Sequence, residues 1–153
     1  MEIERKFLIG SSGDVPGKLA AYPFHDIEQG YLNTEPVVRV RKSDEDYYLT
    51  YKGDGMMTRE EYNLPLTAEA YQHLIQKADG IIITKRRYLI PLENGLTCEL
   101  DVFAGKYDGL LLAEVEFASE EEAQSFVPPA WFGEDVTFDG RYHNSRMSRG
   151  LQN

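Results

Sequence analysis

The chain has 153 residues, of which 42% are hydrophobic and 27% charged, and its net charge is −10. This composition predicts a single domain over residues 1–153, and no apolar run reaches the roughly 20 residues that a membrane span needs. The acidic balance argues against nucleic acid and anionic membranes as partners, because basic surfaces recognise both, and the absence of an apolar signal core near Met1 predicts a cytoplasmic protein.

Short strand-like runs separated by turn signals cover most of the chain. We expect strands at residues 2–9, 27–33, 37–43, 47–52, 57–66, 81–91, 96–103 and 111–117. Ten tyrosines and seven phenylalanines are spread through such runs, and aromatic residues favour strands. Asn94-Gly95 is the best single hairpin signal, because both residues tolerate the left-handed backbone of a tight turn.

Helical signals are fewer than strand signals. Thr67 can cap a helix that ends near Lys77. Ser119 opens a second helix through a capping box. A short helix is expected after Asp14, with a proline in its first turn. The segment from 131 to 153 is predicted to be irregular, with a last helical turn after residue 144.

Charged residues recur at every second position of the strands, so that each set shares one face. The basic members are Lys6, Arg39, Arg41, Lys52, Arg59, Lys85 and Arg87, and the acidic members are Glu2, Glu4, Glu61, Glu99, Asp101, Glu114 and Glu116. A solvated outer face explains any one strand. It explains the whole set less well, because acidic neighbours roughly 7 Å apart repel each other unless a cation lies between them.

A closed barrel accounts for this pattern, with the charged faces turned into a wet lumen and the apolar faces turned outward under helices. Burying so many charges costs free energy unless they are paired or bind a ligand. Rows of arginine and lysine suit several phosphates, and clustered carboxylates suit Mg²⁺ or Mn²⁺. The lumen is therefore predicted to hold a metal–polyphosphate complex.

The order of these motifs resembles that of the CYTH proteins, the triphosphate tunnel metalloenzymes. The resemblance rests on E-x-E-x-K at 2–6, R-x-R at 39–41, K-x-R at 85–87 and E-x-E at 114–116, and it extends through Lys52-Gly53, Arg59 to Glu61, Glu99-Leu100-Asp101 and Asp139-Gly140-Arg141-Tyr142. It covers nearly the whole chain. It implies a β-rich α+β fold, an eight-stranded antiparallel barrel with a few helices packed outside, whose tunnel binds a triphosphate.

The resemblance also implies roles for individual residues. The metal ligands for Mg²⁺ or Mn²⁺ would be Glu2, Glu4, Glu114 and Glu116, which with Lys6 form the catalytic set. The phosphate-binding residues would be Lys6, Arg39, Arg41, Lys52, Arg59, Lys85 and Arg87, with Arg141 at a tunnel mouth. Glu61, Glu99 and Asp101 would support them. Asn63 stands where some relatives carry an acidic residue, which speaks against a metal role there.

Other reactive or aromatic residues have simpler interpretations. Cys98 lies on an apolar face and is predicted to pack in the core, and a lone cysteine excludes an internal disulfide. The histidines, at positions 25, 73 and 143, are too scattered for a zinc motif and are expected at the surface. The tyrosines at 31, 48 and 88 suit either hydrogen bonding in the lumen or core packing.

Three functions fit the resemblance. The first is metal-dependent hydrolysis of a triphosphate, above all inorganic triphosphate, because the short chain leaves little length for a nucleoside pocket. The second is a class IV adenylate cyclase, which makes cyclic AMP and pyrophosphate from ATP in the same tunnel. The third is a non-catalytic polyphosphate- or nucleotide-binding barrel, which the two acidic pairs argue against. The partner is thus a small-molecule triphosphate, and both a monomer and a homodimer remain open.

Overall fold

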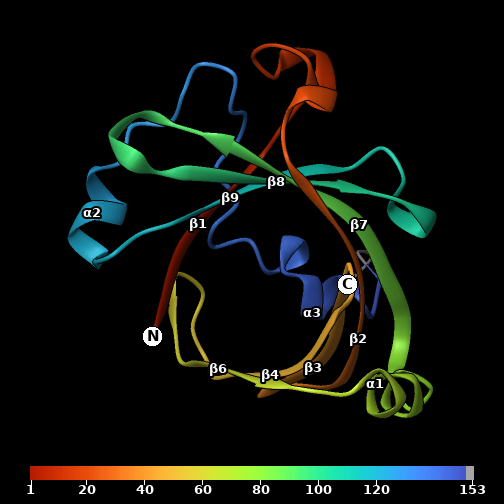
Figure 1. Ribbon diagram of the computed structural model, residues 1–153. Coiled ribbons are helices and arrows are strands. Elements are labelled where there is room, and N and C mark those ends of the chain that lie inside the picture. Colours follow the sequence, from red (N-terminus) through yellow and green to blue (C-terminus); the bar gives the residue numbers. More distant parts are fainter. Residues whose placement is uncertain (151–153) are drawn as a thin grey trace.

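Nine antiparallel strands form one sheet that curls into a nearly closed barrel (Figure 1). The computed structural model describes residues 1–150. The strands are β1 Glu2–Leu8, β2 Phe24–Thr34, β3 Val37–Ser43, β4 Asp46–Lys52, β5 Thr58–Arg59, β6 Glu61–Pro65, β7 Asp79–Pro91, β8 Thr97–Phe103 and β9 Leu111–Glu116. Their order in the sheet is β5-β1-β9-β8-β7-β2-β3-β4-β6. The predicted β-rich antiparallel barrel is confirmed.

One predicted strand, residues 57–66, is two strands that change partner at Glu60. β5 pairs with β1, so that Arg59 lies opposite Glu2, whereas β6 pairs with β4, so that Glu61 lies opposite Lys52. Counted as one interrupted strand, this segment restores the eight strands predicted. We call residues 58–65 the seam, because they join the two ends of the sheet and nearly close the barrel.

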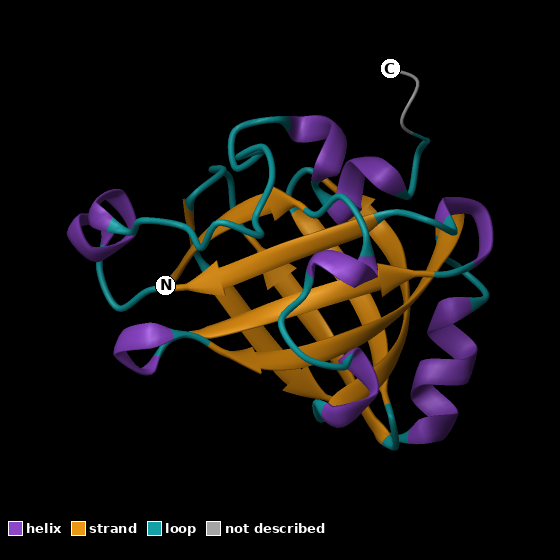
Figure 2. Cartoon of the chain, turned by 90° about the horizontal axis from the view of Figure 1, so that it is seen from above, coloured by secondary structure: helices purple, strands orange, loops and turns teal. Residues whose placement is uncertain are grey.

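Two helices pack outside the barrel and a third lies at its end. α1, Ala68–Ile75, contacts β2, β3 and β4, and α2, Glu120–Ser125, contacts β1. Figure 1 shows α3, Asn144–Met147, within the ring of strands, and Figure 2 shows the other helices around the sheet. No helix within residues 1–150 is long and apolar enough to cross a membrane.

The caps predicted for the two outer helices are present, but the short helix predicted after Asp14 is wrong. Thr67 Oγ1 accepts a hydrogen bond from Ala70 N at 3.0 Å, and Ser119 Oγ accepts one from Glu122 N at 3.1 Å. After Asp14 the backbone of Val15 is extended, because the following proline disfavours the helical region for the residue before it. The segment forms only two 3₁₀ turns, Ser12–Asp14 and Leu19–Ala21.

The strand register brings the charged positions side by side. Asn94 and Gly95 both have a positive φ in the turn that joins β7 to β8, as the hairpin signal predicted. Across the neighbouring strands, the paired positions are Glu4↔Glu116, Lys6↔Glu114, Glu99↔Glu114, Arg87↔Asp101 and Gln29↔Arg41. Acidic groups therefore gather on β1, β8 and β9, whereas β3 carries two arginines with no acidic partner on β2 or β4.

Apolar side chains form one core outside the barrel and another at one end of the lumen. Cys98 is fully buried in the outer core, as predicted, together with Phe7 and Leu100. Inside, the inward positions become apolar at one end of several strands and form an apolar floor with α3, made of Tyr31, Val37, Ile83, Phe103, Leu112 and Met147. The charged part of the lumen thus lies on one side of this floor.

Candidate active site

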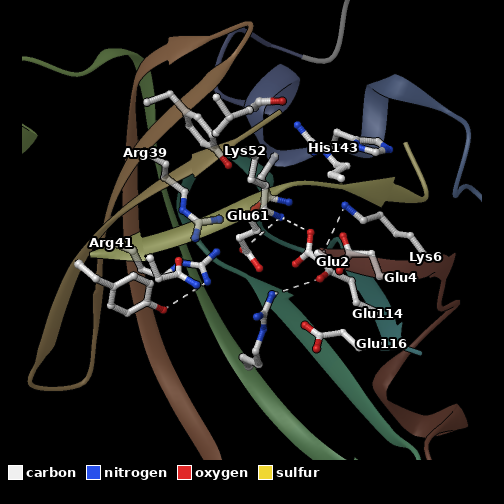
Figure 3. Close-up of a pocket in the computed structure, with 18 of the residues that line it drawn as sticks. Glu2, Glu4, Lys6, Arg39, Arg41, Lys52, Glu61, Glu114, Glu116 and His143 are labelled. Atoms are coloured by element: carbon white, nitrogen blue, oxygen red, sulfur yellow. Dashed lines mark hydrogen bonds and ion pairs between the residues drawn. The ribbon is translucent and has the colours of Figure 1, made fainter. Parts of the chain in front are cut away.

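A cavity of about 390 Å³ occupies the charged part of the lumen (Figure 3). The predicted site residues that line it are Glu2, Glu4, Lys6, Arg39, Arg41, Lys52, Arg59, Glu61, Lys85, Arg87, Glu114 and Glu116. They come from seven strands, β1, β3, β4, β5, β6, β7 and β9. Alternation along each strand therefore brings them together, because every second side chain points inward.

Three carboxylates lie together at one side of the cavity. One oxygen of each of Glu2, Glu4 and Glu116 lies within 4.8 Å of the others. Burial, together with Glu114 and Glu2, raises the pKa of Glu4 well above its ordinary value. Burial and nearby carboxylates, led by that of Glu99, raise the pKa of Glu116 to about 7. These groups repel each other in the protein alone, and a hard divalent cation would relieve the repulsion, because carboxylate oxygens are its preferred ligands.

Glu114 has different neighbours from the other three predicted metal ligands. Its Oε1 lies 3.5 Å from Lys6 Nζ and its Oε2 lies 3.5 Å from Arg87 Nη2. Burial opposes ionisation of Glu114, but these cations prevail and hold its pKa well below the ordinary value. Glu114 thus lies between the cluster of Glu2, Glu4 and Glu116 and the cations Lys6 and Arg87. Glu114 does not belong to that three-carboxylate cluster.

Most of the cations in the lumen are paired with carboxylates. Lys52 Nζ lies 2.8 Å from Glu2 Oε1. Lys85 Nζ and Arg87 Nε each lie 2.8 Å from an oxygen of Asp101, which is fully buried next to the apolar floor. Asp101 and Glu99 do not line the cavity and instead contact Arg87 from behind. A supporting role for both residues stays a prediction.

Arg39 and Arg41 differ, because neither has a carboxylate within 4.0 Å in the described part of the chain. Arg39 Nη2 donates to Thr50 Oγ1 at 2.9 Å, and its buried Nε has no hydrogen-bond partner. Arg41 Nε donates to Gln29 Oε1 at 2.8 Å. Figure 3 shows both arginines across the cavity from Glu2, Glu4 and Glu116. The cavity therefore has an acidic side and a side with uncompensated positive charge.

Arg86 and Arg141 lie outside the cavity. Arg86, between two inward residues, points outward and pairs with Asp26 at 2.7 Å, as strand alternation predicts. Arg141, expected at a tunnel mouth, pairs with Asp139 at 2.6 Å on the surface and does not line the cavity. The contact is bidentate and joins Arg141 to Asp139, the N-cap of a short 3₁₀ turn, Gly140–Tyr142.

Sequence reasoning missed His143 and Asn144, which line the cavity, and Gln29, which contacts Arg41 from behind. The expectation that His143 lies at the surface is wrong, because the segment after β9 folds back over the lumen and places it in the cavity wall. Its Nε2 lies 3.0 Å from Thr137 O, and burial and the charge of Lys6 lower its pKa to about 4. No local motif marks these residues, although neutral Gln29 on an inward position was visible in the alternation.

The tyrosines divide between the lumen and the outer core. Tyr31 and Tyr48 line the cavity, and the Tyr48 hydroxyl lies 3.5 Å from Arg41 Nη1. Tyr88 instead packs against the outer core and contacts the ring of Phe24. Asn63 also lines the cavity but accepts a hydrogen bond from Thr50, so it lies on the basic side, away from the three carboxylates.

The chain is similar to known proteins in both sequence and structure. The model of the CYTH domain matches residues 1–148. An inorganic triphosphatase of Nitrosomonas europaea is 42% identical over 153 residues, covering 98% of both chains. An inorganic triphosphatase of Acetivibrio thermocellus is 38% identical over 151 residues, covering 95% of this chain and 92% of the relative. A crystal structure of an inorganic triphosphatase superposes with a TM-score of 0.71 at 38% identity, covering 97% of this chain and 94% of the other.

Proposed function

Because the chain belongs to the CYTH domain family, we propose that it is a divalent-metal-dependent triphosphatase that hydrolyses inorganic triphosphate. Both curated relatives that align along nearly its whole length are inorganic triphosphatases. The observation that carries the proposal is the division of the cavity. Two buried arginines without carboxylate partners, Arg39 and Arg41, lie across from three clustered carboxylates. A metal-bound polyphosphate matches both sides.

In the proposed reaction, water attacks the terminal phosphorus of triphosphate and the bond to the bridging oxygen breaks, which gives orthophosphate and pyrophosphate. Arg39 and Arg41 bind phosphate oxygens and stabilise the negative charge that spreads over them in the transition state. Lys6 and Arg87 hold Glu114 while facing the same cavity. No side chain is required as a strong base.

Glu2, Glu4 and Glu116 would hold the divalent ion. Their oxygen donors fit Mg²⁺ or Mn²⁺, and the approach of one oxygen of each to within 4.8 Å of the others is the observation that supports a bound cation. When bound, such an ion neutralises phosphate charge and lowers the pKa of a coordinated water. We infer that the enzyme acts in the cytoplasm, as a monomer or a homodimer.

A substrate panel tests the proposed function. Triphosphate, ATP, thiamine triphosphate and pyrophosphate are each incubated with Mg²⁺ or Mn²⁺, and orthophosphate, pyrophosphate and cyclic AMP are measured. We expect orthophosphate release from triphosphate and no cyclic AMP from ATP. Cyclic AMP formation would instead identify a class IV adenylate cyclase. Tight binding of triphosphate without turnover would identify a non-catalytic barrel.

Triphosphate is also expected to stabilise the fold. Arg39, Arg41 and Arg87 line the same cavity, and burial together with the charges of Arg39 and Arg87 lowers the pKa of Arg41. A bound anion relieves the repulsion among these cations. Triphosphate at about 100 times its Kd should raise the free energy of unfolding by about 2.7 kcal/mol. Thermal unfolding at matched ionic strength measures this, and an unchanged midpoint would contradict anion binding in the lumen.

A further inference from the structure

Gln29 is a fully buried amide whose oxygen and nitrogen are both hydrogen-bonded. It lies on β2 directly opposite Arg41 on β3. Its Oε1 accepts from Arg41 Nε at 2.8 Å, and its Nε2 donates to Tyr31 OH at 3.2 Å and to Asn144 Oδ1 at 3.0 Å. Gln29 itself does not line the cavity, whereas Arg41 and Asn144 do. It therefore contacts the site only through other residues.

The orientation of this amide is determined by its neighbours. Arg41 Nε–H can only donate, so it must face the oxygen of Gln29. Asn144 Oδ1 also accepts a hydrogen bond from Lys85 Nζ at 2.8 Å, so the amide nitrogen of Gln29 must face Asn144. Asn144 is the first residue of α3. The helix at the barrel end therefore orients the Gln29 side chain, which in turn orients Arg41.

Arg87 is an arginine of the same cavity whose Nε has a charged partner, a carboxylate, where Arg41 has the neutral amide of Gln29. Its Nε donates to Asp101 Oδ1 at 2.8 Å and its Nη2 donates to Asp101 Oδ2 at 2.9 Å, while Glu99 and Glu114 lie at 3.4 and 3.5 Å. Its charge is thereby compensated within the protein. Arg41 has an equally short contact at Nε, but the partner is neutral. The neutral amide holds the guanidinium without cancelling its charge.

We propose that Gln29 is a positioning residue that fixes Arg41 through Nε, so that the terminal nitrogens and the full positive charge of Arg41 are available to a phosphate group of the substrate. This inference rests on the proposed function for the identity of the anion. A carboxylate at position 29 would still accept from Arg41 Nε, but it would lose the donation to Asn144 Oδ1 and compete with the substrate for the charge of Arg41. An apolar residue would leave the charge but release the side chain.

The substitutions Gln29→Glu and Gln29→Met separate charge from packing, because both nearly preserve the volume of the side chain. For Gln29→Glu we expect Kd and KM for inorganic triphosphate to rise about 10-fold or more, with kcat changed less than KM, because a charge-assisted contact to phosphate is weakened. For Gln29→Met we expect a smaller rise in Kd and KM. Gln72→Glu makes the same amide-to-carboxylate change on exposed α1 and should leave both unchanged.

The measurements are steady-state kinetics with Mg²⁺ and calorimetric titration with triphosphate in excess chelator, after thermal unfolding has shown that each variant is folded. A purely structural role for Gln29 predicts a lower melting temperature and an unchanged Kd. A folded Gln29→Glu variant whose Kd lies within about twofold of the parent would overturn the inference. If Gln29→Glu does not fold, Gln29→Met decides the question by the same criterion.

The outcomes also separate this inference from the proposed function. A parent protein that binds triphosphate without hydrolysing it contradicts the proposed function alone, and the Kd comparison still decides the role of Gln29. A parent that hydrolyses triphosphate, with unaffected position-29 variants, contradicts the positioning role alone. A parent that neither binds nor hydrolyses triphosphate contradicts both.

Discussion

Replacing Glu4 or Glu116 by glutamine is expected to lower kcat/KM for triphosphate by about 100-fold or more, because a catalytic metal would lose a charged ligand. Both carboxylates belong to the three-carboxylate cluster. Glutamine removes a repulsive contact between neighbouring acidic groups, so the metal-free variants should be no less stable than the parent. Steady-state kinetics together with thermal unfolding in chelator measure the two effects separately.

Glu99→Gln is the matched control for these variants. It removes the same charge within the same barrel, but Glu99 lies outside the cavity lining and contacts Arg87 at 3.4 Å. We expect a smaller loss of activity than for Glu4→Gln. Excess chelator should abolish the activity of the parent, and Mg²⁺ or Mn²⁺ should restore it. Full activity in chelator, or a Glu4→Gln variant as active as the parent, would contradict the metal assignment.

Alanine at positions 85, 86 and 87 should give an alternating loss of activity. Lys85 and Arg87 line the cavity, whereas Arg86 is 45% exposed and pairs with Asp26. Loss of a buried charge-assisted contact costs about 1.5–3 kcal/mol, so Lys85→Ala and Arg87→Ala should each lower kcat/KM by about 10- to 150-fold. Arg86→Ala should have little effect, because exposed ion pairs contribute roughly 0–1 kcal/mol.

Arg86→Ala is the internal control of this series, since composition alone cannot rank three consecutive cations. The same alternation predicts that Arg41→Ala is damaging and that Lys42→Ala, at an exposed position, is tolerated. Each variant is compared with the parent after its melting temperature has shown that it is folded. Equal losses at all three positions would show that the inward face of β7 is not the site.

The alternation of charge along the strands was sufficient to predict the barrel and most of the cavity lining. It could predict these features because inward and outward positions follow from the two-residue period of each strand alone. It could not distinguish Glu114 from Glu116, which share a face. Their different surroundings depend on which cations the register brings close to each carboxylate. Of these two residues, only Glu114 lies within 4.0 Å of Lys6 and Arg87 in the described part of the chain.

Features that depend on distant segments were not predictable from local pattern. Asn144 and His143 lie in the lumen because the segment after β9 returns over the barrel end, where Ile81 N donates to Ser148 O at 2.7 Å. The apolar floor likewise requires Met147 to meet inward residues of several strands. The split of the predicted strand 57–66 follows from closure of the sheet, which a strand pattern does not encode.

The seam gives the barrel an uneven resistance to local unfolding. β5 pairs with β1 at two positions, whereas β1 pairs with β9 at five. Segments held by few backbone hydrogen bonds open at lower free energy than the rest of a domain, so the amide hydrogens of β5, at the weakly paired end of the seam, are expected to exchange with solvent before those of β7 or β8. Arg59 and Glu61, on either side of Glu60, both line the cavity. Opening of this segment would therefore expose the lumen through the side of the barrel. A ligand that contacts both Arg59 and Glu61 is expected to stabilise the closed arrangement of β5 and β6.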